Sequence, residues 1–309
     1  MKKITFNCFN QFKCIADKCR HTCCVGWEIS IDKKSLRRFK RDKSVLKNRF
    51  KSSIDFNNGV FILEKGKRCP FLDQNNLCDI IKNSSEKNLC QVCADHPRFR
   101  NFFSDRIEEG FGISCEKATD LLFDFNGEIK EQTELIKGKT KKLTNFENIL
   151  INFREQSINK IFDNTKPFFD RLISLYDGIE NHVNSLNIVK IKEVYNSLER
   201  IDDFLYKSIN KLNDLTFDFD WKYDLALQRL LWYFIVRHVS NSVDNLDIKS
   251  RTLFSVLSLS IIYNVFITSN DKSMENLKDI VREYSKEIEY SEDNVNKILD
   301  YIDQIVVKK

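Results

Sequence analysis

The sequence predicts a mainly α-helical protein, in which an irregular, cysteine-rich N-terminal region with short strands packs on a C-terminal helical bundle. Three prolines and eight glycines in 309 residues are too few for a turn-rich, all-β fold. All ten cysteines lie between Cys8 and Cys115, so the chain divides into a cysteine-rich and a cysteine-free part. The hydrophobic content of 42% allows a buried core and excludes a wholly disordered chain. We therefore expect a cysteine-rich region over residues 1–130 and a helical bundle over residues 131–309.

The N-terminal region carries weak strand signals and one clear helix start. Residues 26–32 alternate between apolar and polar side chains, which predicts a short strand at most. Asp32 is expected to cap the helix that follows it. Residues 59–71 are expected to be extended around a turn, and residues 79–127 to mix short helices with loops.

The C-terminal part shows apolar residues at helical spacing and almost no helix breakers. This period predicts a bundle of about five to seven helices over residues 145–306. Residues 227–239 and 253–267 are apolar nearly all round, so they are expected at the centre of the bundle. The residues expected to be buried there are Leu230, Leu231, Phe234, Leu257 and Ile261.

Charge and hydropathy exclude several classes of partner. The net charge of +5 is small beside 50 basic and 45 acidic side chains, so no nucleic-acid partner is expected. The most apolar stretch, residues 253–267, is interrupted by serines and an asparagine, so no membrane span is expected. The basic start is not followed by an apolar run, so no signal peptide is expected and the predicted location is cytoplasmic. No pattern indicates an oligomeric state.

The cysteines have a spacing typical of metal sites. Thiolates are soft ligands that suit zinc and iron–sulfur clusters. Adjacent side chains diverge, so Cys23 and Cys24 are not expected to share one tetrahedral centre, and one of them could serve a second. The spaced groups are Cys14-x4-Cys19-x3-Cys23-Cys24, Cys69 with Cys78, Cys90-x2-Cys93, and Cys115. The predicted metal ligands are Cys14, Cys19, Cys23, Cys24, Cys69, Cys78, Cys93 and Cys115.

Other interpretations of the cysteines remain open. A zinc ion held by four cysteines could serve only to hold the fold together. Disulfides suit secreted chains and fit less well here. Cys8 stands outside the spaced groups and is expected to be an ordinary thiol. His21 and His96 lie beside cysteines and could bind the metal or support its ligands.

The order of these groups resembles the flagellin lysine N-methylase family. A related cysteine pattern occurs in small proteins described as zinc- or iron-chelating domains. The resemblance covers roughly residues 12–120, and beyond them only the helical character agrees. His96 stands where the family pattern has an aromatic residue, and Cys90 belongs to the pattern less firmly than its neighbours. The motifs that carry it are Cys14-x4-Cys19-x3-Cys23-Cys24-x-Gly26-Trp27, Ile31-Asp32, Cys69-Pro70-Phe71-Leu72, Leu77-Cys78, Cys93-x2-His96-Pro97-Arg98 and Ser114-Cys115-Glu116.

The resemblance implies a methyltransferase. Such an enzyme transfers a methyl group from S-adenosylmethionine to the ε-amine of lysines on flagellin, with a 4Fe-4S cluster, or zinc as the alternative metal. The alternative functions are a non-catalytic zinc- or iron-chelating protein and an interaction protein whose zinc sites only hold its fold.

The sequence does not locate the catalytic machinery. It has no glycine-rich strand–loop–helix signature that would locate the S-adenosylmethionine pocket. Arg98 could hold a cluster sulfide or the carboxylate of the methyl donor. The side chains that could supply a base or a cation-binding face, and that are also ordinary caps, surface charges or core aromatics, are Asp32, Asp73, Asp79, Asp95, Trp27 and Tyr233.

Overall fold

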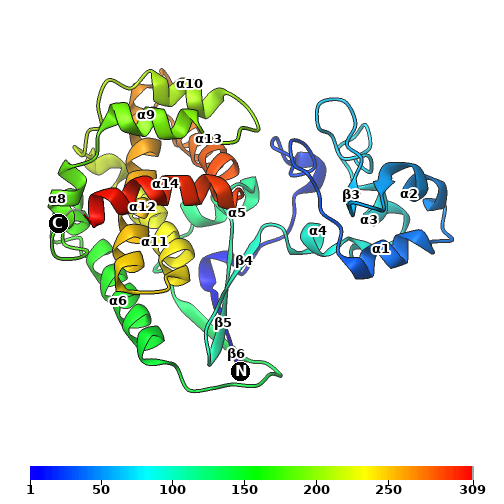
Figure 1. The fold of residues 1–309 in the computed structure, drawn as a ribbon, viewed down its shortest axis with the longest axis horizontal. Coiled ribbons are helices and arrows are strands. Elements are labelled where there is room, and N and C mark those ends of the chain that lie inside the picture. The colour runs from blue at the N-terminus through cyan, green and yellow to red at the C-terminus, as the bar shows by residue number, and fades with distance from the viewer. Residues whose placement is uncertain (308–309) are drawn as a thin grey trace.

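Helices dominate the computed structural model, which describes residues 1–307 (Figure 1). The six strands are β1 (Lys2–Phe6), β2 (Ile54–Asp55), β3 (Val60–Phe61), β4 (Arg98–Phe102), β5 (Arg106–Phe111) and β6 (Glu131–Leu135). The first five α-helices are α1 (Lys33–Lys40), α2 (Lys47–Ser53), α3 (Asp79–Asn83), α4 (Gln91–Asp95) and α5 (Glu116–Phe123). The others are α6 (Asn145–Ile161), α7 (Phe168–Ile173), α8 (Ile179–Asn184), α9 (Ile188–Asn196), α10 (Phe204–Asn210), α11 (Asp224–His238), α12 (Asn245–Thr268), α13 (Met274–Tyr284) and α14 (Glu292–Val306). The predicted fold class is therefore confirmed.

A four-stranded sheet joins the two ends of the N-terminal region. Its strand order is β4-β5-β1-β6, with β1 parallel to β5 and antiparallel to β6. The β4–β5 hairpin lies where the sequence predicted only short helices and loops. Each strand is only five or six residues long, and β1 pairs with segments more than 100 residues away. Local periodicity therefore carries too little signal to predict this pairing.

Two separate hydrophobic cores organise the described residues. The larger core combines β1, β5 and α5 with the C-terminal helices. The smaller core belongs to residues 24–93, which we call the small lobe, and it is built on α1, α2 and α3. In Figure 1 the small lobe lies beside the helical body, at the right of the view. The predicted domain boundary falls just before β6 and stays a prediction.

The centre of the helical body is formed by α11 and α12. Leu230, Phe234, Leu257 and Ile261 have no exposed surface and Leu231 is 1% exposed, which confirms the predicted core. By length and composition alone α12 could cross a membrane, but 83% of its most apolar window is buried inside the protein, as in a core helix.

The helices of residues 145–307 are more numerous than predicted. This range contains the nine α-helices α6–α14 and no strand, against an expectation of five to seven helices. Residues 174–178 separate α7 from α8, and Gly178 at the N-cap of α8 takes a left-handed conformation with φ of 89°. Residues 197–203 likewise separate α9 from α10. The apolar period continues across such breaks, so it does not reveal them.

Candidate metal centre

The structure brings four of the thiols together beside the start of α5. The pKa of the Cys23 thiol is raised, first by its hydrogen bond with Cys24 and then by burial. The nearby charges of Cys14 and Cys115 raise this pKa further. Burial also raises the pKa of Cys19 to about 12, and Cys115 contributes to the rise. We call Cys14, Cys19, Cys23 and Cys115 the first thiol group.

A carboxylate next to Cys115 fixes the loop that carries Cys19. The Cys19 thiol lies 3.7 Å from Oε2 of Glu116, and the Arg20 amide donates to the same oxygen at 2.8 Å. Cys115 occupies the N-cap position of α5, where backbone amides lower the pKa of its thiol, but burial outweighs them and raises this pKa. The N-terminal loop is thereby held against the N-terminus of α5.

Five further thiols lie in the core of the small lobe. The Cys69 amide donates to the Cys24 carbonyl at 2.8 Å, and a β-bridge between Leu72 and Cys78 folds the following loop back. Burial raises the pKa of Cys69 to about 12, and the charges of neighbouring thiols add to this rise. We call Cys24, Cys69, Cys78, Cys90 and Cys93 the second thiol group.

The predicted ligands are thus divided between two places. We assign Cys23 to the first group and Cys24 to the second, although the two side chains form a hydrogen bond with each other. Cys90 lies in the second group although it was left out of the predicted set; its Cys-x2-Cys spacing to Cys93 was the signal that could have found it. Cys8 is buried in the larger core, outside both groups. Metal binding by these thiols stays a prediction.

The spacing of the thiols bears on the choice of metal. In residues 1–307, only Asp202, Glu283 and Glu287 form a set of three metal-type side chains with ligand atoms all within 4.8 Å. Lys286 already pairs with two of these carboxylates, so this set is an ion-pair network. Sulfurs around one zinc ion lie about 3.5–4 Å apart, whereas those around a cubane cluster lie about 6–7 Å apart. Over the same range, residues 1–307, no three sulfurs lie within 4.8 Å of one another, and the choice between zinc and a cubane stays a prediction.

A cavity of about 230 Å³ adjoins the first thiol group, and we call it the Cys23 pocket. Arg282 of α13 lies in its wall and is 2% exposed. Nη1 of Arg282 lies 3.9 Å from Glu116 Oε2 and makes no hydrogen bond to any described residue. A buried donor without a partner indicates room for an anionic ligand. The lining residues are Arg20, His21, Thr22, Cys23, Val25, Trp27, His96, Ser114, Arg282, Glu283 and Lys286.

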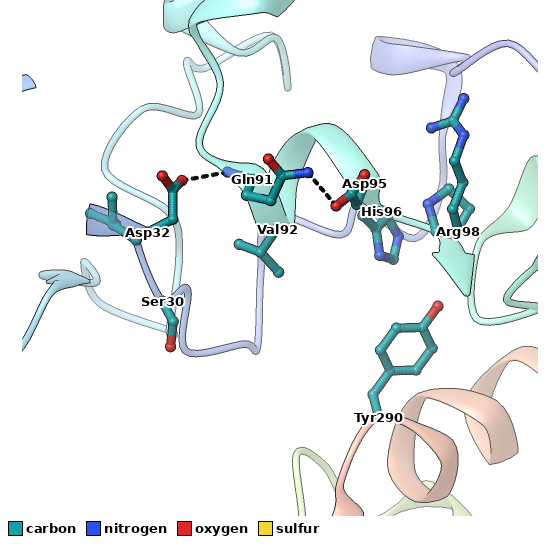
Figure 2. Close-up of a pocket in the computed structure, with 10 residues that line it drawn as sticks. Ser30, Asp32, Gln91, Val92, Asp95, His96, Arg98 and Tyr290 are labelled. Carbon is teal, nitrogen blue, oxygen red and sulfur yellow. Dashed lines mark hydrogen bonds between the residues drawn. The ribbon is translucent and has the colours of Figure 1, made fainter. Parts of the chain in front are cut away.

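A second cavity, of about 460 Å³, lies between the small lobe and Tyr290, which follows the π-helix Ser285–Glu289 at the end of α13, and we call it the Tyr290 pocket (Figure 2). Gln91 bridges its two carboxylates, through its amide to Asp32 at 2.9 Å and through its side chain to Asp95 at 2.5 Å. Burial alone would raise the pKa of Asp32, but hydrogen bonds from Gln91 and Ser35 outweigh burial and lower it to about 2. This wall is therefore negatively charged at neutral pH.

His96 borders both pockets. The centre of its ring lies 5.8 Å from the centre of the Tyr290 ring. Trp27 contacts the Tyr290 ring edge-on, with 5.2 Å between the ring centres. Burial lowers the pKa of His96 to about 4, and the charge of Arg237 adds to this shift. A Cβ at Gly112 would lie 2.1 Å from the Tyr290 hydroxyl, so only glycine allows this close approach.

Most of the other sequence candidates have structural contacts. Asp32 caps α1 by accepting from the Ser35 amide at 2.9 Å, which confirms the predicted helix start. Asp73 accepts two backbone amides in a turn, and Asp79 pairs with Arg49. Tyr233 is buried in a network with Glu289. Neither pocket is lined by Asp73, Asp79 or Tyr233.

Arg98 packs on aromatic rings. Its guanidinium lies 5.0 Å from the centre of the Phe111 ring and 5.7 Å from that of Phe12. Figure 2 shows the side chain pointing away from Tyr290, although it lines the rim of the Tyr290 pocket. The first thiol group therefore has Arg282, rather than Arg98, as the buried arginine in its pocket.

Comparison with known proteins finds distant relatives that are named lysine-N-methylase. Over 140 residues, covering 40% of this chain, it is 23% identical to proteins named lysine-N-methylase from Salmonella typhimurium and Salmonella choleraesuis. It is 22% identical to a protein named flagellar biosynthetic protein FliU from Salmonella muenchen, of which it covers 80%. The match spans about a third, 34%, of the length of the lysine-N-methylases. No family model matches the chain, and no solved structure matches it significantly. The chain is thus distantly similar to lysine-N-methylases.

Proposed function

We propose that this chain is a cytoplasmic, S-adenosylmethionine-dependent lysine methyltransferase that acts on flagellin. The observation that carries the proposal is the similarity to lysine-N-methylases and to the FliU protein. The pocket beside the first thiol group supports it, because this pocket joins a thiol, a buried arginine and an aromatic face.

The first thiol group suits a 4Fe-4S cluster. It offers four soft donors from two separate segments, residues 14–23 and Cys115, which is the donor set that such clusters require. Bound there, a cluster would supply a redox-active iron centre at the edge of the Cys23 pocket. Cys23 itself lines this pocket, and Glu116 and Arg20 hold the supporting loop in place.

The Cys23 pocket has features that suit the methionine end of the methyl donor. The partly unsatisfied guanidinium of Arg282 would bind the donor's carboxylate. The ring of Trp27 would face the cationic sulfonium, a contact that aromatic faces favour. These two side chains would orient the donor toward His96 and the Tyr290 pocket.

The Tyr290 pocket has features that suit a lysine side chain. Asp32 and Asp95 would attract the ammonium group as it enters. The lysine must become neutral to attack, and its ordinary pKa of about 10.4 opposes this. Asp32 and Asp95 would raise the pKa of that amine, whereas desolvation against Tyr290 and the neutral His96 ring would lower it, so the amine would have to move from the carboxylates to the rings before it attacks.

The test measures methyl transfer directly. Anaerobically purified, iron-loaded protein is incubated with S-adenosylmethionine and flagellin, and modified lysines are counted by mass spectrometry. Arg282→Gln is expected to raise KM for S-adenosylmethionine at least about tenfold, because a charge-assisted contact worth about 1.5–3 kcal/mol is lost. Cys8→Ala is the matched control, because Cys8 lies outside both thiol groups, and it should transfer methyl groups normally.

Two outcomes would contradict the proposal at different levels. Absence of methyl transfer to any flagellin, with the cluster loaded, rejects the activity. Equal rates for zinc-loaded, iron-free protein reject only the role of the cluster. A chelating protein without catalysis is the second candidate, because the two thiol groups would serve it equally well. It would bind metal stoichiometrically and transfer no methyl group.

A further inference from the structure

We propose that the two basic helices of the small lobe, α1 and α2, are a docking surface for an acidic segment of the protein that this chain methylates. The identity of this partner as the methyl acceptor rests on the proposed function, whereas its acidic character rests on the charge of the surface. We call this the α1–α2 surface, and its exposed side chains are Lys33, Lys34, Arg37, Lys40, Arg41, Lys43, Lys47 and Lys51.

Basic side chains are concentrated in this part of the chain. Residues 33–51 contain ten of the 50 basic side chains but only one of the 45 acidic ones. The rest of the chain therefore carries slightly more acidic than basic side chains, although the net charge of the whole chain is +5. Within the described part of the chain, the eight side chains of the α1–α2 surface form no ion pair, whereas the neighbouring Arg49 pairs with Asp79. An unpaired positive surface of this kind attracts anionic partners.

The basic side chains of α1 share one face of the helix. Positions 33, 34, 37, 40 and 41 recur at helical spacing, and the opposite face, with Ser35 and Phe39, is buried. The ring of Phe39 stacks on that of Phe50 in α2, with 4.4 Å between the ring centres. This stack fixes the two helices relative to each other, so their charges are held at defined places.

The pattern of charges does not stabilise the two helices. Lys33 and Arg37, like Lys47 and Lys51, are like charges four residues apart, and such pairs destabilise a helix. Lys33 also lies in the first turn of α1, where the helix dipole disfavours a cation and where no acidic residue is present. An anionic partner would relieve both effects, so the surface suits binding better than it suits folding.

The α1–α2 surface begins beside the Tyr290 pocket. Asp32 lines this pocket and also caps α1, so Lys33 directly follows the acidic wall that Asp32 and Asp95 form. A partner that occupies both places must offer a cation to the pocket and anions to the helices, as a lysine with acidic neighbours does. The eight residues of α1 span about 12 Å, which is the length of about four extended residues of a partner. The acidic residues are therefore expected within a few positions of the lysine.

Nucleic acids and membranes fit this surface less well than an acidic protein segment does. Nucleic-acid bases stack on exposed aromatic rings, but Phe39 and Phe50 are each only 2% exposed. Helices that lie in a membrane interface expose an apolar face, whereas Val45 is the only large apolar side chain that residues 33–51 expose. The acidic wall of the Tyr290 pocket would also repel phosphate groups.

The first experiment measures binding to purified full-length protein by fluorescence anisotropy. The probe is a labelled synthetic peptide that contains one lysine with aspartate and glutamate residues on both sides. A reference peptide has asparagine and glutamine in place of these acidic residues. Wild-type protein is expected to bind the acidic peptide more tightly than the reference peptide, and this binding should weaken as the salt concentration rises.

Two variants remove the same number of charges at different places. The test variant changes three exposed side chains of α1, Lys33→Gln, Arg37→Gln and Lys40→Gln. The matched control changes three exposed lysines that follow β6 and also form no ion pair, Lys137→Gln, Lys139→Gln and Lys142→Gln. We expect the test variant to bind the acidic peptide about tenfold more weakly than the wild type, because three surface ion pairs are lost. The control should bind like the wild type.

Three results would overturn the proposal. The first is equal affinity of the test variant and the wild type for the acidic peptide. The second is equal affinity of the wild type for the two peptides. The third comes from parallel titrations with vesicles of phosphatidylcholine and phosphatidylglycerol and with a single-stranded RNA. If the substitutions in α1 weaken binding to either of these more than binding to the peptide, the surface belongs to a membrane or to a nucleic acid instead.

The second experiment tests the connection with methyl transfer. With flagellin as the substrate, the test variant should raise KM for flagellin and leave kcat and KM for S-adenosylmethionine unchanged, because α1 does not line the Cys23 pocket. An unchanged KM for flagellin would overturn the role of the surface in substrate docking. If the wild type transfers no methyl group, the proposed function fails, but the binding experiment still decides whether acidic segments dock on the α1–α2 surface.

Discussion

At the scale of single residues, His96 illustrates how burial sets a protonation state. Its folded pKa of about 4 lies below the value of about 6.5 for an unfolded chain. Between pH 6.5 and pH 4 the unfolded state therefore binds a proton that the folded state does not. The free energy of unfolding should fall as the pH falls through this window, and the contribution of His96 is complete above pH 6.5.

This pH dependence can be measured by urea unfolding at several pH values between 4 and 7.5. His96→Phe, which restores the aromatic residue of the family pattern, should lose stability less steeply than the wild type on acidification. Both proteins keep the same thiols and carboxylates, so the difference between them isolates the imidazole. Identical slopes would show that His96 titrates normally in the folded protein.

At the scale of elements, one buried ion pair connects the sheet to the helical body. Arg154 of α6 donates to both carboxylate oxygens of Glu108 on β5, at 2.5 and 2.7 Å, and also to Ser240 at 2.7 Å. Arg154 is 2% exposed and Glu108 has no exposed surface. Removing one partner therefore leaves the other charge, or its hydrogen bonds, without compensation.

Replacement of Arg154 by methionine should lower the free energy of unfolding by about 3–5 kcal/mol, as measured by denaturant unfolding. The double variant Arg154→Met with Glu108→Gln should recover part of this loss, because no buried charge remains. If the double variant is as unstable as the single one, packing around Arg154 rather than its charge is responsible.

At the scale of the whole molecule, Arg20 connects the loop of the first thiol group to the helical body. It pairs with Glu116 and Asp279, each at 3.2 Å, and with Glu275. Its side chain is 47% exposed, so these pairs should contribute less than about 1 kcal/mol to stability. Their expected effect is on the position of this loop and of the small lobe that follows it.

We therefore expect Arg20→Ala to keep its melting temperature within a few degrees of the wild type. We also expect faster chymotrypsin cleavage after Trp27 and a larger radius of gyration by small-angle X-ray scattering. Lys18→Ala, two residues away and outside these pairs, should leave both measurements unchanged. A radius of gyration unaffected by Arg20→Ala would mean that other contacts, such as that of Trp27 with Tyr290, position the loop.

The sequence by itself determined the features that depend on near neighbours. The central helices α11 and α12 were predicted because their apolar residues recur at short, regular intervals. The Asp32 cap was also predicted from near neighbours, because the amide that Asp32 binds belongs to Ser35, three residues further along the chain. The clustering of the cysteines likewise indicated soft-metal chemistry before any geometry was known.

Only the tertiary structure decided how those pieces combine. The place of β1 between β5 and β6 depends on contacts between segments more than 100 residues apart, for which short strands carry no local signal. The division of the thiols into two groups, with Cys90 in the second, depends on which loops meet in space. The burial of Arg282 beside Cys23 also depends on tertiary packing, because an arginine in an amphipathic helix is expected to be exposed until its neighbours in space are known. Spacing along the chain identifies which atoms could bind a metal, but packing between distant segments decides which of them share a site.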